Sequence, residues 1–139
     1  MTTDSKLFEE LSYYTLSHSN SDYFIHQLIV DAFTAQTANK DTKRISLVFS
    51  LVGLYLLNEK KYTGKQIQQA HTMLSSYKNY LPKIKLPENR GEITISDVLK
   101  SELNRDEMIK RWCSSVWKAY KANQEGIKQF CETYLLKKQ

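Results

Sequence analysis

Residues 45–57 read ISLVFSLVGLYLL, a run that is apolar on nearly every side when it is drawn as a helix. A helix without a polar face must be enclosed by other helices, because each of its sides needs an apolar neighbour. Arg44 precedes this run of thirteen residues and Glu59 follows it closely. A membrane span needs roughly 20 apolar residues, so we predict a buried central helix at about residues 43–60 and no membrane span.

The rest of the sequence predicts further helices around this one. The chain has only four glycines and two prolines in 139 residues, which disfavours a turn-rich β-fold. Helical patterns and capping residues divide it into segments at about 5–16, 23–37, 43–60, 63–81, 97–103 and 104–136. We predict a single all-α domain over residues 1–139, a compact bundle of five or six helices with an irregular loop at 82–95 that carries both prolines.

Polar residues near the start of each segment are expected to cap the helices, since their side chains can bond the free N–H groups of a first turn. They are Asp4, Ser21 or Asp22, Asp41 or Thr42, Thr63 with Gln66, Ser96, and Asn104 with Glu107. Ile93 and Ile95 are expected to form a short extended piece before the fifth helix.

The last segment is amphipathic. At about 100° per residue its apolar side chains fall in one arc, and the arc keeps its phase across Gly126. We therefore predict one long helix, with Gly126 as the place for any kink. Trp112 and Trp117 lie on the apolar stripe, where tryptophans are more often core residues than a ligand platform. Asn123 is the polar residue inside the stripe.

Residues 24–37, FIHQLIVDAFTAQT, set a histidine, an aspartate and two glutamines among large apolar residues. Such polar groups either perform chemistry or hold a core together, so His26, Asp31 and Gln36 are candidate catalytic residues. His26 lies about 140° around the helix from Asp31, however, so the two cannot form a simple pair on one face.

We favour the interpretation that these polar residues hold the core together and do not perform chemistry. His26 and His71 are candidate metal ligands, but a zinc site needs three or four ligands and we expect no metal. One hydrogen bond from another helix would satisfy a buried histidine. We therefore predict a polar core network of His26, Ser50 and Asn123, in which His26 meets one of the other two.

Other sequence features narrow the function. Cys113 and Cys131 lie eighteen residues apart without a CxxC motif, which predicts two free, buried thiols in a reducing cytoplasm. Burial should raise the pKa of the Cys113 thiol rather than activate it. The sequence has no glycine-rich phosphate loop and no GxSxG motif, and we expect no cofactor.

The net charge of +5 is unevenly spread. Residues 1–59 carry four basic and seven acidic groups, whereas residues 60–139 carry sixteen and eight. An excess of cations in one half can mark a nucleic-acid partner. Here the cations are mostly lysines scattered among acids, which favours an ordinary solvated surface.

Four stretches together resemble an uncharacterised bacterial family among the domains of unknown function. The stretches are HQLIVDAFTAQT, SLVFSLVGLYL, ITISDVL and RWCSSVWKAY, and the resemblance spans residues 26 to about 127. The family pattern reads roughly H-x-L-x-V-D-A-Y-x-x-Q-H, then S-x-x-V-H-L-x-G-L, L-T-V-x-D-V and W-x-x-x-V-W-x-A-W-x-x-H-H. The matching residues are His26, Val30, Asp31, Ala32, Gln36, Gly53, Asp97, Val98, Trp112, Val116 and Trp117.

The resemblance implies a helical bundle but no activity. Where the pattern has further histidines, this chain has Thr37, Ser50, Asn123 and Gln124. Several histidines converging from different helices would suggest a metal site. If the family binds a metal, the departures imply that this chain has lost it.

We expect a small, non-enzymatic, cytoplasmic bacterial protein that acts by protein–protein binding, either as a homodimer or as an accessory subunit. The alternative is a metal-dependent or small-molecule enzyme site around His26 and Asp31. A weaker alternative is nucleic-acid association through the basic C-terminal half.

Overall fold

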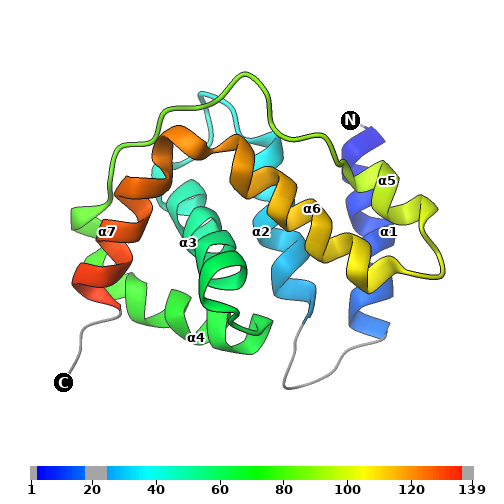
Figure 1. Cartoon of the computed structure of the whole chain (residues 1–139), viewed down its shortest axis with the longest axis horizontal. Helices are drawn as coiled ribbons and strands as arrows, with labels where there is room; N and C mark the ends of the chain where they lie inside the picture. Colours follow the sequence, from blue (N-terminus) through cyan, green and yellow to red (C-terminus); the bar gives the residue numbers. More distant parts are fainter. Residues whose placement is uncertain (1–2, 18–24, 136–139) are drawn as a thin grey trace.

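The computed structural model describes residues 3–17 and 25–135 (Figure 1). These residues form seven α-helices and two short 3₁₀ helices, with no strand. The elements are α1 (Thr3–Ser17), α2 (Ile25–Thr37), α3 (Arg44–Lys60), α4 (Gly64–Leu74), η1 (Ser75–Tyr80), α5 (Ile95–Lys100), α6 (Arg105–Ala119), η2 (Lys121–Asn123) and α7 (Gln124–Tyr134). The predicted all-α bundle is confirmed, with seven α-helices instead of five or six because the last predicted helix is divided.

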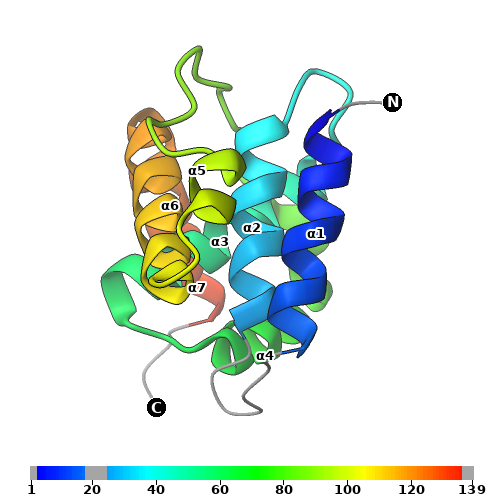
Figure 2. The ribbon, with the colours of Figure 1, turned by 90° about the vertical axis from the view of Figure 1, so that its right-hand side faces the viewer.

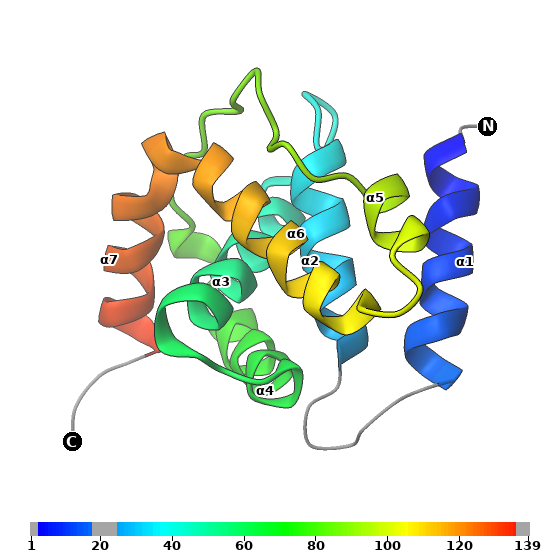
Figure 3. The same ribbon diagram turned by 45° about the vertical axis from the view of Figure 1, so that its right-hand side comes forward.

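The helix α3 is the centre of the bundle, as its apolar sequence predicts. It contacts α2, α4, α6 and α7, and Figure 3 shows it between α7 and α2 with α4 beneath. The buried residues of α3 form an almost unbroken run, 47–48 and 50–56. None of the helices in residues 3–17 and 25–135 has the length and apolar content that a membrane crossing requires.

The helix α1 lies at one end of the molecule, beside α2 and α5 (Figure 2). Its inner face buries Leu11 and Thr15 completely, and the ring of Phe8 stacks on Phe33 of α2 with centroids 4.5 Å apart. The helix α7 lies at the opposite end of the longest axis (Figure 1).

The C-terminal segment is two helices, so the prediction of one long helix is wrong. The break is the 3₁₀ turn η2 at residues 121–123, and Gly126 lies inside α7 with open space around it. Tyr120 closes α6 with backbone bonds to Val116 and Trp117, 3.3 and 3.1 Å long. The tighter turn that follows brings Asn123 against the loop at Lys85, which is the physical reason for the break.

Two of the helix starts are made by capping boxes. The predicted box of Thr63 and Gln66 is confirmed, since each side chain bonds the other's backbone N–H. At α5 the cap is Thr94, with Asp97 as its partner, so the predictions of Ser96 as cap and of an extended piece at Ile93 and Ile95 are wrong. The spacing T-x-x-D carries the box, and Ile95 is already helical.

The other predicted caps behave differently. Thr42 accepts from the Asn39 N–H at 2.9 Å and closes a turn, so α3 begins after Lys43 without a side-chain cap. Asn104 makes no capping bond at α6. Asp4 lies inside the first turn of α1. The predicted caps Ser21 and Asp22 lie outside the described residues.

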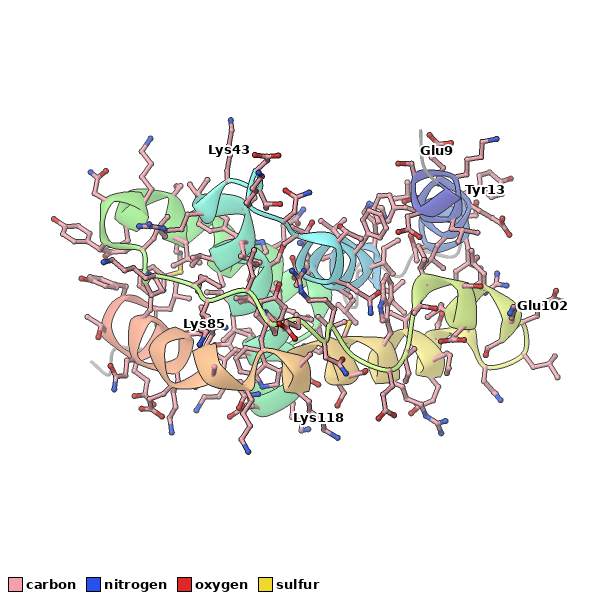
Figure 4. The ribbon with its side chains drawn as sticks, turned by 90° about the horizontal axis from the view of Figure 1, so that it is seen from above. Glu9, Tyr13, Lys43, Lys85, Glu102 and Lys118 are labelled. Atoms are coloured by element: carbon pink, nitrogen blue, oxygen red, sulfur yellow. The ribbon has the colours of Figure 1, made fainter. Side chains whose placement is uncertain are left out.

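Residues 81–94, between η1 and α5, form a long irregular loop that crosses one edge of the bundle (Figure 4). Ser115 of α6 fixes it, because its Oγ accepts from the N–H groups of Glu92 and Ile93 at 2.9 and 3.3 Å. Gly91 has a φ of +107° at this point, and a Cβ there would lie 2.7 Å from Ser115 Oγ. Glycine is therefore required for the loop to approach α6.

Candidate functional site

Asp31 lies in the middle of α2 and is 2% exposed. Gln27, one turn earlier, donates from Nε2 to Asp31 Oδ1 at 3.1 Å. Asp31 Oδ2 has no hydrogen-bond partner among the described residues. A buried carboxyl with one satisfied and one unsatisfied oxygen is uncommon, so this group is the first candidate for a functional site.

Gly53 of α3 supplies the space for this carboxyl. A Cβ at residue 53 would overlap Asp31 Oδ2 and would lie 2.7 Å from Asp31 Cγ and 3.2 Å from Ile67 Cγ2. The carboxyl therefore occupies the volume that a side chain at position 53 would fill.

Burial governs the electrostatics of this region. It raises the pKa of Asp31 well above the ordinary value of 3.8, and the hydrogen bond from Gln27 opposes that rise only in part. Burial also raises the pKa of the Cys113 thiol, and the nearby Asp31 carboxyl raises it further. Cys113 Sγ donates to the carbonyl of Leu28 at 3.5 Å. Both groups favour their neutral forms, as the sequence predicts for the thiol.

His26 is engaged with α1 rather than with Asp31. Its Nδ1 lies 2.9 Å from Thr15 Oγ1. The Thr15 hydroxyl donates to the Ser12 carbonyl at 3.0 Å, so the histidine is the donor to Oγ1. Burial lowers the pKa of His26, which favours the neutral ring that this pairing uses.

His71 is engaged with α3. Its Nε2 donates to the carbonyl of Phe49 at 2.8 Å, and the two rings stack with centroids 5.3 Å apart. Burial lowers the pKa of His71, and the bond to Phe49 offsets this in part. His26 and His71 thus have separate partners. Within residues 3–17 and 25–135, no three or more His, Cys, Asp or Glu side chains converge as a group that could hold a metal ion.

Gln36, the third candidate catalytic residue, joins α2 to the loop and to α6. Its Nε2 donates to the carbonyls of Ile93 and Arg90 at 2.8 and 3.2 Å. Its Oε1 accepts from Trp112 Nε1 at 2.9 Å. Both amide hydrogens and the amide oxygen are therefore used in holding three segments together.

Asn123 also holds the loop, on the side toward α7. Its Oδ1 accepts from the Lys85 N–H at 2.8 Å and its Nδ2 donates to the Lys85 carbonyl at 2.7 Å. The structure therefore does not bring His26 and Asn123 together as the sequence predicts. Ser50 is buried on α3, and no hydrogen bond among the described residues links it to either of them.

Arg90 ties the loop to the C-terminal end of α2, and the sequence pattern does not identify this role. Its Nη1 donates to the carbonyls at the C-terminal end of α2, with Ala38 the closest at 2.7 Å. Its Nε donates to the Pro87 carbonyl at 2.6 Å, which stiffens the loop. The last turn of α2 has no basic residue of its own. The last turns of α1 and α7 lack one as well, so this feature of the sequence does not single out α2 or Arg90.

The positions that carry histidines in the family pattern do not form one site here. Thr37 Oγ1 donates to the Phe33 carbonyl at 2.7 Å and Gln124 Nε2 donates to the Trp117 carbonyl at 3.0 Å. Thr37 and Gln124 bond within their own segments, whereas Asn123 pairs with Lys85 of the loop, 38 residues away in the sequence.

The fold and these polar contacts define a small all-α protein whose buried polar side chains tie its helices to one long loop. The chain belongs to a family of unknown function, DUF5946, whose sequence pattern matches residues 5–121. This match confirms the resemblance to an uncharacterised family. No curated protein and no solved structure matches the chain.

The anchoring role of Asn123 leads to a stability prediction. Asn123→Ala is expected to lower the free energy of unfolding by about 1–3 kcal/mol, because the N–H and C=O of Lys85 lose their partner. Asn123→Asp should be at least as harmful, since a carboxylate cannot donate to the carbonyl. Urea unfolding measures both, with Asn79→Ala in the exposed part of η1 as control. Equal stability of all three variants would contradict the anchor.

Proposed function

We propose that this chain is a small cytoplasmic bacterial protein that acts by protein–protein binding and not by catalysis. The observation that supports this most directly is the outer face of α1. Tyr13 is 77% exposed and Leu16 is 56% exposed on this face, while the inner face packs on α2 and α5. Large apolar side chains on an outer helix face are typical of a surface that a partner covers.

The polar residues that suggested catalysis support the same proposal. Gln36 has its amide fully used by the loop and by Trp112. His26 and Asp31 line none of five surface hollows found in the described residues, whereas Gln36 lines one of them. A substrate would need both access to a catalytic group and hydrogen-bonding capacity left on it.

The proposed cytoplasmic location rests on the cysteines. Cys113 and Cys131 are both free and buried. Free thiols in a small helical protein are typical of a reducing compartment.

A site-specific cross-linker tests the proposed function. With a photoreactive amino acid in place of Tyr13 or, in a second variant, of Leu16, we expect a covalent adduct with another polypeptide after irradiation of cells that make the protein. The same amino acid at Lys43, which is exposed ahead of α3, should give none. Mass spectrometry identifies the adduct. Absence of any adduct from positions 13 and 16 would refute binding through α1.

One observation favours a second candidate function. Asp31 Oδ2 is buried without a hydrogen-bond partner, and unsatisfied carboxyls are more frequent at enzyme sites than elsewhere. Asp31→Asn is the test, because the amide has nearly the same shape. The growth of cells that lack the gene is compared after they receive the wild type or the variant. If the variant folds but does not replace the wild type, the result supports a small-molecule enzyme site. If it replaces the wild type fully, the result supports binding.

A further inference from the structure

The exposed large apolar side chains of the described residues lie at the two ends of the molecule. Tyr13 and Leu16 are on α1, and Leu103, which is 98% exposed, follows α5 at the same end. Met73 in the last turn of α4 and Tyr80 at the end of η1 are the others, at 52% and 61%. Figure 1 shows α1 and α5 at one end of the long axis and η1 with α7 at the other. Within residues 3–17 and 25–135, none of the large exposed apolar side chains lies on the long sides of the molecule.

The end formed by η1 and α7 carries an aromatic cluster beside a surface hollow. Tyr134 is the centre of an aromatic cluster, with ring centroids 4.7 Å from Tyr77, 5.7 Å from Tyr80 and 5.2 Å from Phe130. A surface hollow of about 190 Å³ adjoins it, with Met73 and Leu135 among its lining residues. Aromatic and methionine side chains beside a hollow are typical anchors of a protein interface.

The two ends carry opposite charge. Residues 3–17 of α1 have three acidic side chains and one lysine, and Figure 4 shows Glu9 and Tyr13 together at that edge with Glu102 close to the same end. Residues 75–85, which form η1 and the start of the loop, have three lysines and no acid. The helix α7 at the same end adds one lysine and two glutamates, so the two segments together have four lysines and two acids. Apolar surfaces with complementary charge attract each other and fix their relative orientation.

We propose that the α1 end of one copy docks on the η1–α7 end of a second copy, head to tail. The proposal rests on the proposed function and names a second copy of this chain as the partner. The same chain supplies both halves of the interface, an acidic apolar face and a basic aromatic face. Because the two faces differ, each docked copy leaves one face free, and the contact repeats into a chain or closes into a ring.

Single-stranded nucleic acid is the other occupant that Tyr80 and the nearby lysines would suit, since bases stack on exposed aromatic rings. It would leave the acidic apolar face of α1 without a partner. The second copy accounts for both ends, so the structure favours it.

Two variants separate a head-to-tail contact from every symmetric one. Tyr13→Lys removes an apolar group and places a cation against the lysines of the other end. Met73→Ser with Tyr80→Ser removes the apolar groups of that other end. Sedimentation velocity at low salt is expected to show wild-type mass rising with concentration, each variant as a monomer, and their equimolar mixture as a dimer. Only the unaltered end of each variant can then pair. Lys43→Ser, on a long side, should behave as wild type.

Several results would overturn the proposal. Wild-type protein that stays monomeric at its highest soluble concentration would do so, as would variants that fail to pair when they are mixed. Circular dichroism checks that the variants are folded. We expect them to fold because Tyr13, Met73 and Tyr80 are all exposed. Salt-sensitive binding of oligothymidylate by a monomeric wild type, lost in the serine variant, would reassign the basic end to nucleic acid. A cross-linked adduct at Tyr13 with a different protein would retain the proposed function and remove the second copy as partner.

Discussion

Gly53→Ala is expected to lower the free energy of unfolding by at least about 3 kcal/mol, which is the upper part of the range for overpacked cores. The added Cβ would overlap Asp31 Oδ2 and would lie 2.7 Å from Asp31 Cγ. Neither group can move easily, because Asp31 is buried at the contact of α2 and α3. Urea unfolding at neutral pH measures the loss, and a protein that fails to fold would be the extreme form of the same result.

The double variant Asp31→Ala, Gly53→Ala identifies the cause. Removing the carboxyl frees the space for the new methyl group, so the double variant should be more stable than Gly53→Ala alone. We expect a coupling energy above about 1 kcal/mol, as for residues in direct contact. Additive losses would show that α3 rejects alanine for another reason, such as the contact with Ile67.

Gly126→Ala is the matched control. Gly126 lies within α7, and a Cβ there meets nothing within 4 Å. Alanine is the better helix former by about 1 kcal/mol, so this variant should be slightly more stable than wild type. The same substitution in two helices thus has opposite effects, decided by the neighbour of the added methyl group.

The features that the sequence predicts correctly are local or periodic. The all-round apolar run at 45–57 identifies α3 as central because only enclosure can satisfy every side of such a helix. Trp112 and Trp117 are 0% and 4% exposed, as their place on the apolar stripe implies. The capping box of Thr63 and Gln66 needs only residues three apart, so it can be read directly.

The candidate site depends on contacts between distant parts of the chain. At Gly53 the close approach to α3 is made by the carboxyl of Asp31, a partner from another helix. Periodicity gives the face on which a residue lies and not the partner that faces it. The pairing of Arg90 with the end of α2, across more than 50 residues of sequence, has the same origin.

The sequence pattern also does not reveal that the last predicted helix is divided into α6 and α7. The turn η2 has three residues, and a 3₁₀ turn of this length shifts the angular phase of the following residues by about 60°, which is less than the width of an apolar helix face. The apolar stripe therefore continues through the break from Val116 to Ile127, both of which are buried. The signal for the break is the bond between Asn123 and Lys85, which only the folded loop provides.

Asp31→Asn is expected to stabilise the protein, and by more at high pH than at low pH. The folded-state pKa of Asp31 is raised above 3.8 by burial, so between these values the folded protein binds a proton that the unfolded chain has lost. Stability then falls as the pH rises from about 4 through the folded pKa, where it levels off. An uncompensated charge in a protein interior costs about 3–5 kcal/mol, which sets the scale of the gain once wild type is ionised.

The difference in unfolding free energy between Asp31→Asn and wild type should therefore be small at pH 4 and grow toward pH 9. His26 and His71 have lowered pKa values, so they reduce the stability of the folded protein as the pH falls below 6.5. Both histidines are present in the wild type and in the variant, so their contribution cancels when the two unfolding free energies are subtracted. Cys113 stays a neutral thiol over this range, since burial raises its pKa. Asp41→Asn, at an exposed carboxyl, is the control for the loss of one acidic side chain. A flat difference for Asp31→Asn would mean that its carboxyl titrates as in the unfolded chain, and the enclosed site around Gly53 would have to be abandoned.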